Sequence, residues 1–227
     1  MSSRPSRLRR RSPFSVLGVV LLVLGLSCLG YVGYQYIGSN VVADRAFDSG
    51  SEGLRQRWQS ESPTPSAASA SPTPEEAGPL PGRATALLRI PAFGPDYEIP
   101  VLEGTDLDIL QEGVGHYPGT AEAGQVGNFA LAGHRVTHGQ PFRRLLELQP
   151  GDQVVVETVS AVYTYVMDKA PGSLTVADTA TWVLDPVPGE PAAQPVKALI
   201  TLTTCQDLVR SADRSVGFGH LQSTRNK

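Results

Sequence analysis

A charge-free apolar segment near the N-terminus sets the first limit on how this chain can fold. No charged residue occurs between Arg11 and Asp44, and the stretch from Pro13 to Tyr36 is rich in Val, Leu and Gly. About 20 apolar residues are needed to cross the hydrocarbon core of a bilayer. Five arginines precede the segment, and cytoplasmic flanks carry such a basic excess. The pattern predicts a cytoplasmic tail over residues 1–12, a single membrane anchor over residues 13–37 and an extracellular remainder.

Two other interpretations of the same segment remain open. A cleaved signal peptide also begins with basic residues and an apolar run, but this run is longer than usual and no clear Ala-x-Ala site follows it. The sequence Gly25-Leu-Ser-Cys28 resembles a lipoprotein box, although Gly25 stands where an apolar residue is expected. The anchor is the interpretation that agrees with the length of the run.

The charge of the remainder argues against one class of partner. Without the five N-terminal arginines, the chain holds 14 basic and 22 acidic residues, a net charge of −8. Nucleic-acid-binding domains are typically basic, so we expect no nucleic-acid partner. The arginine cluster fits the flank of a membrane segment better than it fits a nucleic-acid site.

The segment after the predicted anchor has the composition of a stalk. Residues 62–74 consist almost entirely of Pro, Ser, Thr and Ala, which cannot bury enough apolar surface to fold. The preceding residues are mixed and polar, with room for a short helix around Leu54 to Trp58. We therefore expect a disordered extracellular stalk over residues 38–83.

Residues 84–223 have the pattern of a mostly β domain. Short runs with alternating or β-branched apolar residues are separated by turns, which favours a barrel or a sandwich. Short helices are expected near residues 107–111 and 141–148, and a long Pro-rich connection spans residues 171–196. Connections of that length in a compact domain are usually functional.

Three residue types that support nucleophilic chemistry stand at the ends of predicted strands. Cys205, the single cysteine outside the apolar segment, ends the strand that begins at Ala198, and Arg214 follows nine residues later. His134 ends the strand that begins at Asn128. Because an adjacent imidazole or cation activates a thiol, these residues predict a cysteine-based catalytic site. A buried, inert cysteine is the alternative.

Four segments in this order resemble the sortase family, and in particular its class E branch. They are Gly115-His-Tyr-Pro-Gly-Thr120, Gly127-Asn-Phe-Ala-Leu-Ala-Gly-His-Arg135, the run from Pro141 to Asp152, and Thr201-Leu-Thr-Thr-Cys205 with its following arginine. The resemblance covers roughly residues 84–221. It implies an eight-stranded β-barrel in which the 171–196 connection borders a substrate groove.

The resemblance also implies a reaction. A class E sortase is a membrane-anchored cysteine transpeptidase that cleaves a C-terminal sorting signal of the LAxTG or LPxTG type between Thr and Gly. It joins the Thr carbonyl to an amine of a peptidoglycan precursor, without a cofactor. The implied catalytic residues are Cys205, His134 and Arg214, and Asn128, Thr204 and Trp182 are candidates for substrate binding. A pilin-polymerising sortase with a lysine acceptor, or an inactive membrane-tethered binding barrel, are the alternatives.

Competing residues are weaker candidates for these roles. Arg210 is the nearest alternative to Arg214, because Gln206-Asp-Leu replaces the start that is common after the cysteine in class E. Three further histidines are expected to have structural or surface roles: His116, His138 and His220. His116 or His138 could instead line the groove. One external cysteine and scattered histidines do not have the usual zinc spacings, so no metal site is expected.

Overall fold

The computed structural model describes residues 13–34, 38–61, 82–205 and 212–227. Two compact units divide the chain, one over Met1–Gly38 and one over Ser39–Lys227. The first contains helix α1 (Pro13–Gly33), in which most of the large apolar side chains that can be described are exposed. Among the described residues, no helix has the length and apolar character that crossing a membrane requires. The anchor over residues 13–37 stays a prediction.

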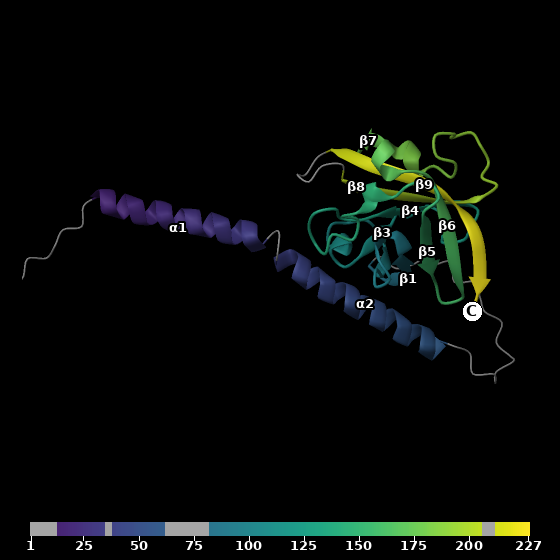
Figure 1. Ribbon diagram of the computed structural model, residues 1–227, viewed down its shortest axis with the longest axis horizontal. Coiled ribbons are helices and arrows are strands. Elements are labelled where there is room, and N and C mark those ends of the chain that lie inside the picture. The colour runs from purple at the N-terminus through teal and green to yellow at the C-terminus, as the bar shows by residue number, and fades with distance from the viewer. Residues whose placement is uncertain (1–12, 35–37, 62–81, 206–211) are drawn as a thin grey trace, which may run out of the picture. The chain divides into compact units, whose positions relative to one another are not determined.

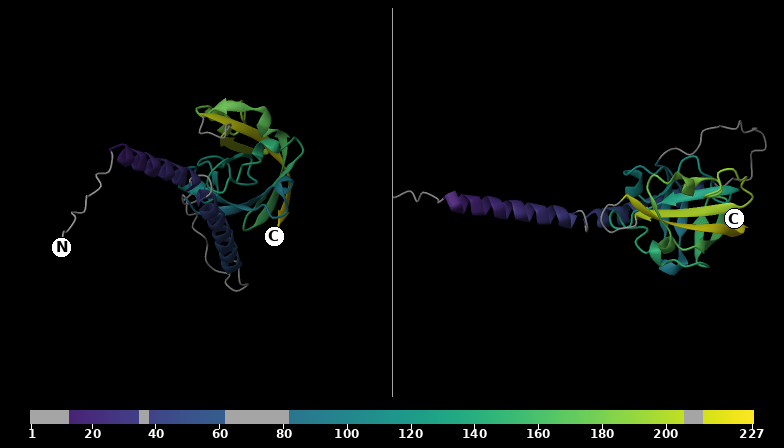
Figure 2. Two further views of the ribbon diagram at one scale, coloured as in Figure 1. Left: turned by 60° about the vertical axis from the view of Figure 1, so that its left-hand side comes forward. Right: turned by 90° about the horizontal axis from the view of Figure 1, so that it is seen from above.

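The second unit is built on a closed β-barrel, whose ribbon is shown in Figures 1 and 2. Eight strands follow one another around it, and the last pairs with the first to close it. In spatial order they are β6 (Ala161–Lys169), β5 (Gln153–Glu157), β1 (Ala84–Arg89), β2 (Ile99–Glu103), β3 (Val114–His116), β4 (Gly127–Ala132), β8 (Ala198–Cys205) and β9 (Asp213–Asn226). The short β7 (Thr175–Ala177) pairs with the start of β9. The predicted eight-stranded barrel with short helices is confirmed.

Apolar side chains from alternate strand positions fill the barrel. Phe129 and Leu131 of β4 and Ile200 and Leu202 of β8 belong to one buried core, because successive side chains of a strand point to opposite faces. The residues between them therefore point to the outer face. β9 is long enough for its first half to pair with β8 and its second half to pair with β6. It ends at Asn226, beyond the boundary predicted at residue 223.

Two strand pairings decide where the predicted site residues meet. β4 and β8 are parallel, and Ala132 lies opposite Thr203. Their carboxyl ends therefore reach the same rim of the barrel. β8 and β9 are antiparallel, and their last aligned pair is Cys205 opposite Arg214. A residue that follows β4, the end of β8 and the start of β9 thus come together at one rim.

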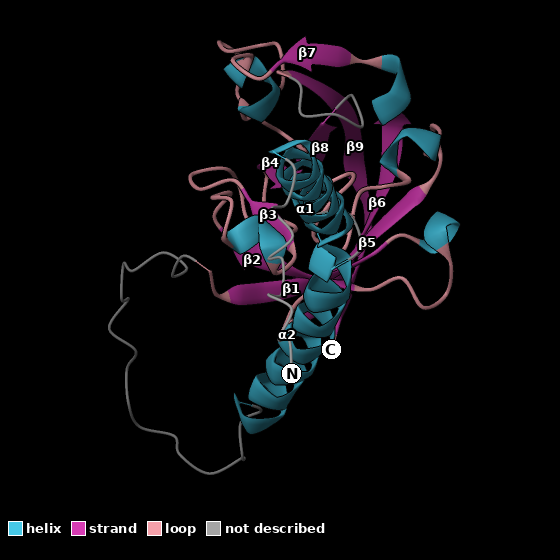
Figure 3. Ribbon diagram, turned by 90° about the vertical axis from the view of Figure 1, so that its left-hand side faces the viewer, coloured by secondary structure: helices cyan, strands magenta, loops and turns pink. Residues whose placement is uncertain are grey.

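A helix much longer than the short one expected around Leu54 to Trp58 replaces the start of the predicted stalk. Helix α2 (Ser39–Glu61) belongs to the barrel unit and lies against β1 and β2, as Figure 3 shows. Its buried stripe contains Ser39, Ala43, Phe47, Ser51 and Leu54. Two of these five positions are serine, so the apolar period is weak and composition alone indicated a polar linker. Residues 39–61 are thus part of the folded unit, and residues 62–81 lie outside the described part of the chain.

Short elements differ from the predicted ones in detail. Residues 113–127, a Gly-rich segment whose five glycines and one proline predict a loop, contain β3. The helix expected over residues 141–148 is a series of turns around the 3-10 helix η4 (Leu145–Glu147). Two other predicted features keep their place. A 3-10 helix, η3 (Ile109–Gln111), stands within residues 107–111, and the 171–196 connection contains η5 (Pro171–Ser173), β7 and η6 (Thr181–Leu184).

Candidate active site

Cys205 and Arg214 form the last aligned pair of β8 and β9. Residues directly opposed in an antiparallel pair have their Cα atoms about 4.5–5.5 Å apart, with both side chains on the same face. Cys205 is a free thiol and is partly exposed. The Arg214 side chain is 32% exposed, with Nη1 donating to the Asp213 carbonyl at 3.2 Å and Nη2 3.9 Å from Asp178 Oδ2. A thiol and a guanidinium therefore share one side of the rim.

His134 reaches the same rim through the parallel pairing of β4 and β8. Ala132 is opposite Thr203. Two residues further along the sequence from each of them stand His134 and Cys205. Two hydrogen bonds continue the pairing past the end of β4: Gly133 N donates to Thr203 O at 3.2 Å, and Thr204 Oγ1 donates to Gly133 O at 2.8 Å. The structure thus brings all three predicted catalytic residues to one rim.

The imidazole of His134 lies in an environment that favours its neutral form. Its Nε2 is buried and has no hydrogen-bond partner among the described residues. Burial, and secondarily the nearby His138, lower the pKa of His134 to about 4. The two rings lie 4.9 Å apart between centroids. A buried nitrogen without a partner is uncommon, and a perturbed pKa is frequent at functional sites. At neutral pH this ring can accept a proton.

The lowered pKa of His134 predicts a pH dependence of stability. An unfolded histidine has a pKa near 6.5, against about 4 in the folded chain. Between these values the unfolded state binds more protons, so the free energy of unfolding should fall as pH decreases from about 6.5 towards 4. Burial lowers the pKa of His138 in the same direction. Thermal unfolding measured across this range should show a smaller fall for His134→Gln; an equal fall in both proteins would contradict the prediction.

Thr204 supports His134 from inside the barrel wall. Its side chain is buried, and its hydroxyl donates to the carbonyl of Gly133, the residue before His134. The role of Thr204 in substrate binding stays a prediction. Its side-chain hydrogen bond is to the backbone just before His134. Arg210, the alternative to Arg214, lies outside the described residues, whereas the pairing of Arg214 with Cys205 supports its assignment.

Asn128 and Trp182 lie nearer the other ends of the two strands. The buried Asn128 Nδ2 donates to Val183 O at 3.0 Å and to Asp185 O at 3.1 Å, and its Oδ1 accepts from Thr201 Oγ1 at 2.7 Å. Asn128 thereby fastens the 171–196 connection to the barrel. Trp182, on that connection, is 37% exposed and faces Phe218 at 6.1 Å between ring centroids. Asn128 precedes His134 by six residues, about 20 Å of extended strand, so Asn128 lies away from the rim that His134 follows. The substrate-binding roles of Asn128 and Trp182 stay predictions.

Two residues that the sequence analysis did not select lie near the catalytic candidates. Tyr117 directly follows β3, and its hydroxyl lies 3.2 Å from Thr203 Oγ1, two residues before Cys205 on the same face. His138 was expected to have a structural or surface role, and its ring packs against the ring of His134. The position of Tyr117 in the Gly-rich segment was the available signal. Nothing in the local pattern could indicate the His138 contact, because it depends on a turn with an unusual backbone.

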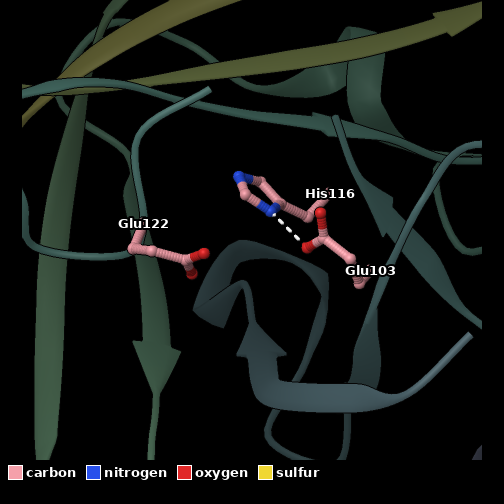
Figure 4. A group of neighbouring side chains, drawn as sticks. All are labelled: Glu103, His116 and Glu122. Carbon is pink, nitrogen blue, oxygen red and sulfur yellow. Dashed lines mark hydrogen bonds and ion pairs between the residues drawn. The ribbon is translucent and has the colours of Figure 1, made fainter. Parts of the chain in front are cut away.

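Among the described residues, Glu103, His116 and Glu122 form a group that could hold a metal ion, with one ligand atom of each within 4.8 Å of the others. Figure 4 shows Glu122 pointing towards the imidazole of His116, whose Nδ1 is 2.7 Å from Glu103 Oε2. His116 Nε2 contacts Ala121 O at 3.1 Å and Thr120 Oγ1 at 2.9 Å, and that hydroxyl donates to Tyr117 O.

The hydrogen bonds of His116 favour a proton over a metal ion in this cluster. The Ala121 carbonyl can only accept, and the Thr120 hydroxyl already donates to Tyr117 O, so these contacts favour a hydrogen on Nε2. A metal ion bound at Nε2 would have to displace that hydrogen. The cluster instead ties the loop after β3 to the end of β2, which is a structural role. The expectation of no metal site stays a prediction.

Comparison with known proteins assigns this arrangement to a family. The sortase domain family matches residues 88–222, which include His134, Cys205 and Arg214. Sortase SrtE1 of Streptomyces coelicolor is 33% identical over 219 residues, covering 92% of this chain and 57% of its own length. The chain thus spans little more than half of that relative. The structure of sortase E from Streptomyces avermitilis matches with 39% identity and a TM-score of 0.58, covering 65% of this chain and 93% of that one.

A third match is the crystal structure of sortase E1 from Streptomyces coelicolor with a tripeptide in the active site. It is 35% identical, has a TM-score of 0.56, and covers 66% of this chain and 94% of that chain. The family match spans more than half of the chain, and these relatives are sortases E. The chain therefore belongs to the sortase family, in its class E branch.

Proposed function

We propose that this protein is a cysteine transpeptidase that cleaves a sorting signal and joins the released carbonyl to an amine. The observation that carries the proposal is the strand register, which pairs Cys205 with Arg214 and brings the ends of β8 and β4, just before Cys205 and His134, to one rim. A thiol, an imidazole and a guanidinium on one rim are groups that support acyl transfer through a thioester.

The environment of His134 supports a specific order of proton transfers. Neutral His134 accepts the proton of the Cys205 thiol as the sulfur attacks the carbonyl carbon of the Thr–Gly bond. The oxygen becomes an oxyanion, to which the Arg214 guanidinium donates. As the C–N bond breaks, the amine of the glycine-side fragment takes the proton from His134. The Thr carbonyl remains as a thioester on Cys205.

A second half-reaction releases the product and restores the enzyme. The acceptor amine attacks the thioester carbonyl while His134 takes one of its protons. The C–S bond breaks and Cys205 takes the proton back as a thiol. No cofactor takes part, because the step exchanges one amide for another without a change of oxidation state. The relative with a tripeptide in its active site supports a peptide as the substrate.

The proposed substrates and location follow from the family and the sequence. The substrates are secreted proteins with a C-terminal LAxTG- or LPxTG-like signal, and the acceptor is an amine of a peptidoglycan precursor. The charge-free run after five arginines supports a single-pass membrane anchor with a cytoplasmic N-terminus and an extracellular catalytic domain. The catalytic unit would then act on proteins that are still close to the membrane.

A peptide panel tests the proposed function. The purified full-length chain is incubated with LAxTG, LPxTG and scrambled peptides, with glycine-type or lysine-type amines as acceptors. We expect release of the glycine-side fragment from the motif peptides alone, together with an amide product that contains the added amine. Absence of both products with every motif peptide, from a folded protein, would exclude the proposal. Transfer to lysine alone would indicate a pilin-type reaction.

Arg214→Ala should lower kcat/KM roughly 10²- to 10³-fold, because removing one oxyanion donor costs about that much. Arg214→Lys should recover part of the rate, since it keeps the charge but not the planar fork. Arg210→Ala is the matched control and should stay within about tenfold of wild type by the same scale. Steady-state transpeptidation measures all three. A severe loss at Arg210 with none at Arg214 would reverse the assignment.

A further inference from the structure

We propose that helix α2 is part of the active-site scaffold, and that Asn40, Ala43 and Phe47 position His134 by holding the turn that follows it. The inference rests on the proposed function, because it takes His134 to act in the reaction. Helix α2 begins nearly 100 residues before His134 in the sequence. We call residues 137–140 the histidine turn.

The histidine turn contacts α2 through its glycine. Gly139 N donates to Asn40 Oδ1 at 2.9 Å. A Cβ atom on Gly139 would overlap the ring of Phe47 and lie 3.1 Å from Ala43 Cβ. Ala43 and Phe47 are 2% and 4% exposed and belong to the barrel core cluster. The turn backbone therefore lies directly on the buried face of α2.

The backbone of the histidine turn needs such a support. His138, Gly139 and Gln140 have φ values of 54°, 74° and 51°, so three consecutive residues are left-handed. Only glycine adopts this region readily, because the Cβ atom of other residues approaches the carbonyl oxygen. Non-glycine residues persist there when the surrounding structure over-determines them, and such residues cluster at functional sites. The hydrogen bond to Asn40 and the contact with Phe47 are the constraints that α2 supplies.

The turn is connected to His134 at two points. The His138 ring lies 4.9 Å from the His134 ring, with an interplanar angle of 33°. Phe142 N, after the turn, donates to His134 O at 2.9 Å. A change in the turn would therefore move both the ring beside His134 and the backbone contact of His134 itself. The path from α2 to the imidazole consists of direct contacts.

The same helix offers a matched control far from the turn. Leu54 is 3% exposed and lies 14 residues after Asn40, about 21 Å along the helix. Leu54→Ala removes buried apolar contacts of α2 without touching residues 137–140. A purely structural role of α2 predicts that Leu54→Ala and Phe47→Ala impair the enzyme in proportion to their loss of stability. A positioning role predicts that only the variants near the turn change the chemistry.

The test compares Asn40→Ala, Asn40→Asp, Phe47→Ala and Leu54→Ala in the full-length chain. Asn40→Ala and Phe47→Ala should lower kcat about tenfold or more with KM little changed, since small misplacements of catalytic groups cost up to about 10²-fold. Asn40→Asp keeps the acceptor oxygen and should restore most of the rate. Leu54→Ala should lower the melting temperature and leave kcat near wild type. Equal losses of kcat in Phe47→Ala and Leu54→Ala at equal loss of stability would overturn the proposal.

A readout without substrate separates this inference from the proposed function. NMR titration of the His134 ring reports its environment whether or not any peptide is turned over. The pKa of His134 should move towards its ordinary value in Asn40→Ala and stay unchanged in Leu54→Ala. An unchanged titration in Asn40→Ala would overturn the inference even if the enzyme is active. Absence of turnover in wild type, with the titration shifted as expected, would count against the proposed reaction alone.

Discussion

Cys205→Ala should abolish both cleavage of the motif peptide and transfer to the amine, and leave the fold intact. The thiol provides the sulfur of the proposed thioester, and no other cysteine occurs after residue 28. Loss of the nucleophile in a hydrolase of comparable chemistry costs about 10⁶-fold in kcat, which places the variant below detection. Cys205 is partly exposed, so replacing it should leave core packing unchanged. Release of the glycine-side peptide, followed by chromatography, is the measurement.

Cys28→Ala is the control for this prediction. Cys28 lies in the other compact unit and is exposed, so its removal should leave the rate unchanged. Mass spectrometry should detect a covalent acyl adduct on Cys205 in wild type when no amine is supplied, and no adduct in Cys205→Ala. Wild-type turnover in folded Cys205→Ala would refute the thioester route and favour the inactive binding barrel.

His134→Ala should lower kcat/KM by roughly 10²- to 10⁴-fold, the usual contribution of a general acid–base group. His134 follows β4 by two residues, as Cys205 follows Thr203, the partner of Ala132. Its Nε2 has no partner among the described residues, and its lowered pKa leaves it neutral at pH 7, the form that can take up a proton. Steady-state transpeptidation, with folding checked by circular dichroism, measures the effect.

His116 and His220 serve as controls, with expected losses of about tenfold or less on the same scale, and His138→Ala, which removes the ring packed against His134, should still cost less than His134→Ala. His220 is 40% exposed and pairs with Asp168, so its replacement should have the smallest effect. His116 is buried against Glu103, so its replacement should act through stability and its rate should be corrected for the folded fraction. A folded His134→Ala enzyme near the wild-type rate would contradict the assignment, as would a larger loss at His138 than at His134.

Much of the barrel and the candidate site could be predicted because their signals are local. Strands such as Ala198–Cys205 carry their own pattern of β-branched and apolar residues. The catalytic candidates stand at strand ends, beside motifs with characteristic spacing. A candidate nucleophilic thiol is also easy to select when a single cysteine occurs after residue 28. Those features are properties of short segments, so one chain without a structure was enough to propose them.

Other features depend on contacts between distant segments. Asn128 was a candidate for substrate binding, but three hydrogen bonds tie it to Thr201 and to the loop of Val183. Their partners lie more than 50 residues away. The apolar stripe of α2 is interrupted by Ser39 and Ser51, so its period was too weak to indicate a packed helix. These residues can be recognised as a packing stripe only together with the barrel surface that they contact.

Local pattern and the resemblance to a known family were therefore sufficient to propose the chemistry of the chain: a candidate nucleophile, the groups that accompany it, and the barrel that carries them. Three-dimensional packing was needed for the environment of those groups. It set Cys205 opposite Arg214, packed the ring of His134 against that of His138, and placed α2 against the left-handed turn at Gly139. The physical reason is that a residue's type and its place in a strand are encoded within a few neighbours. The exposure of a side chain, its pKa and the contacts that hold its backbone depend on which distant segments pack against it.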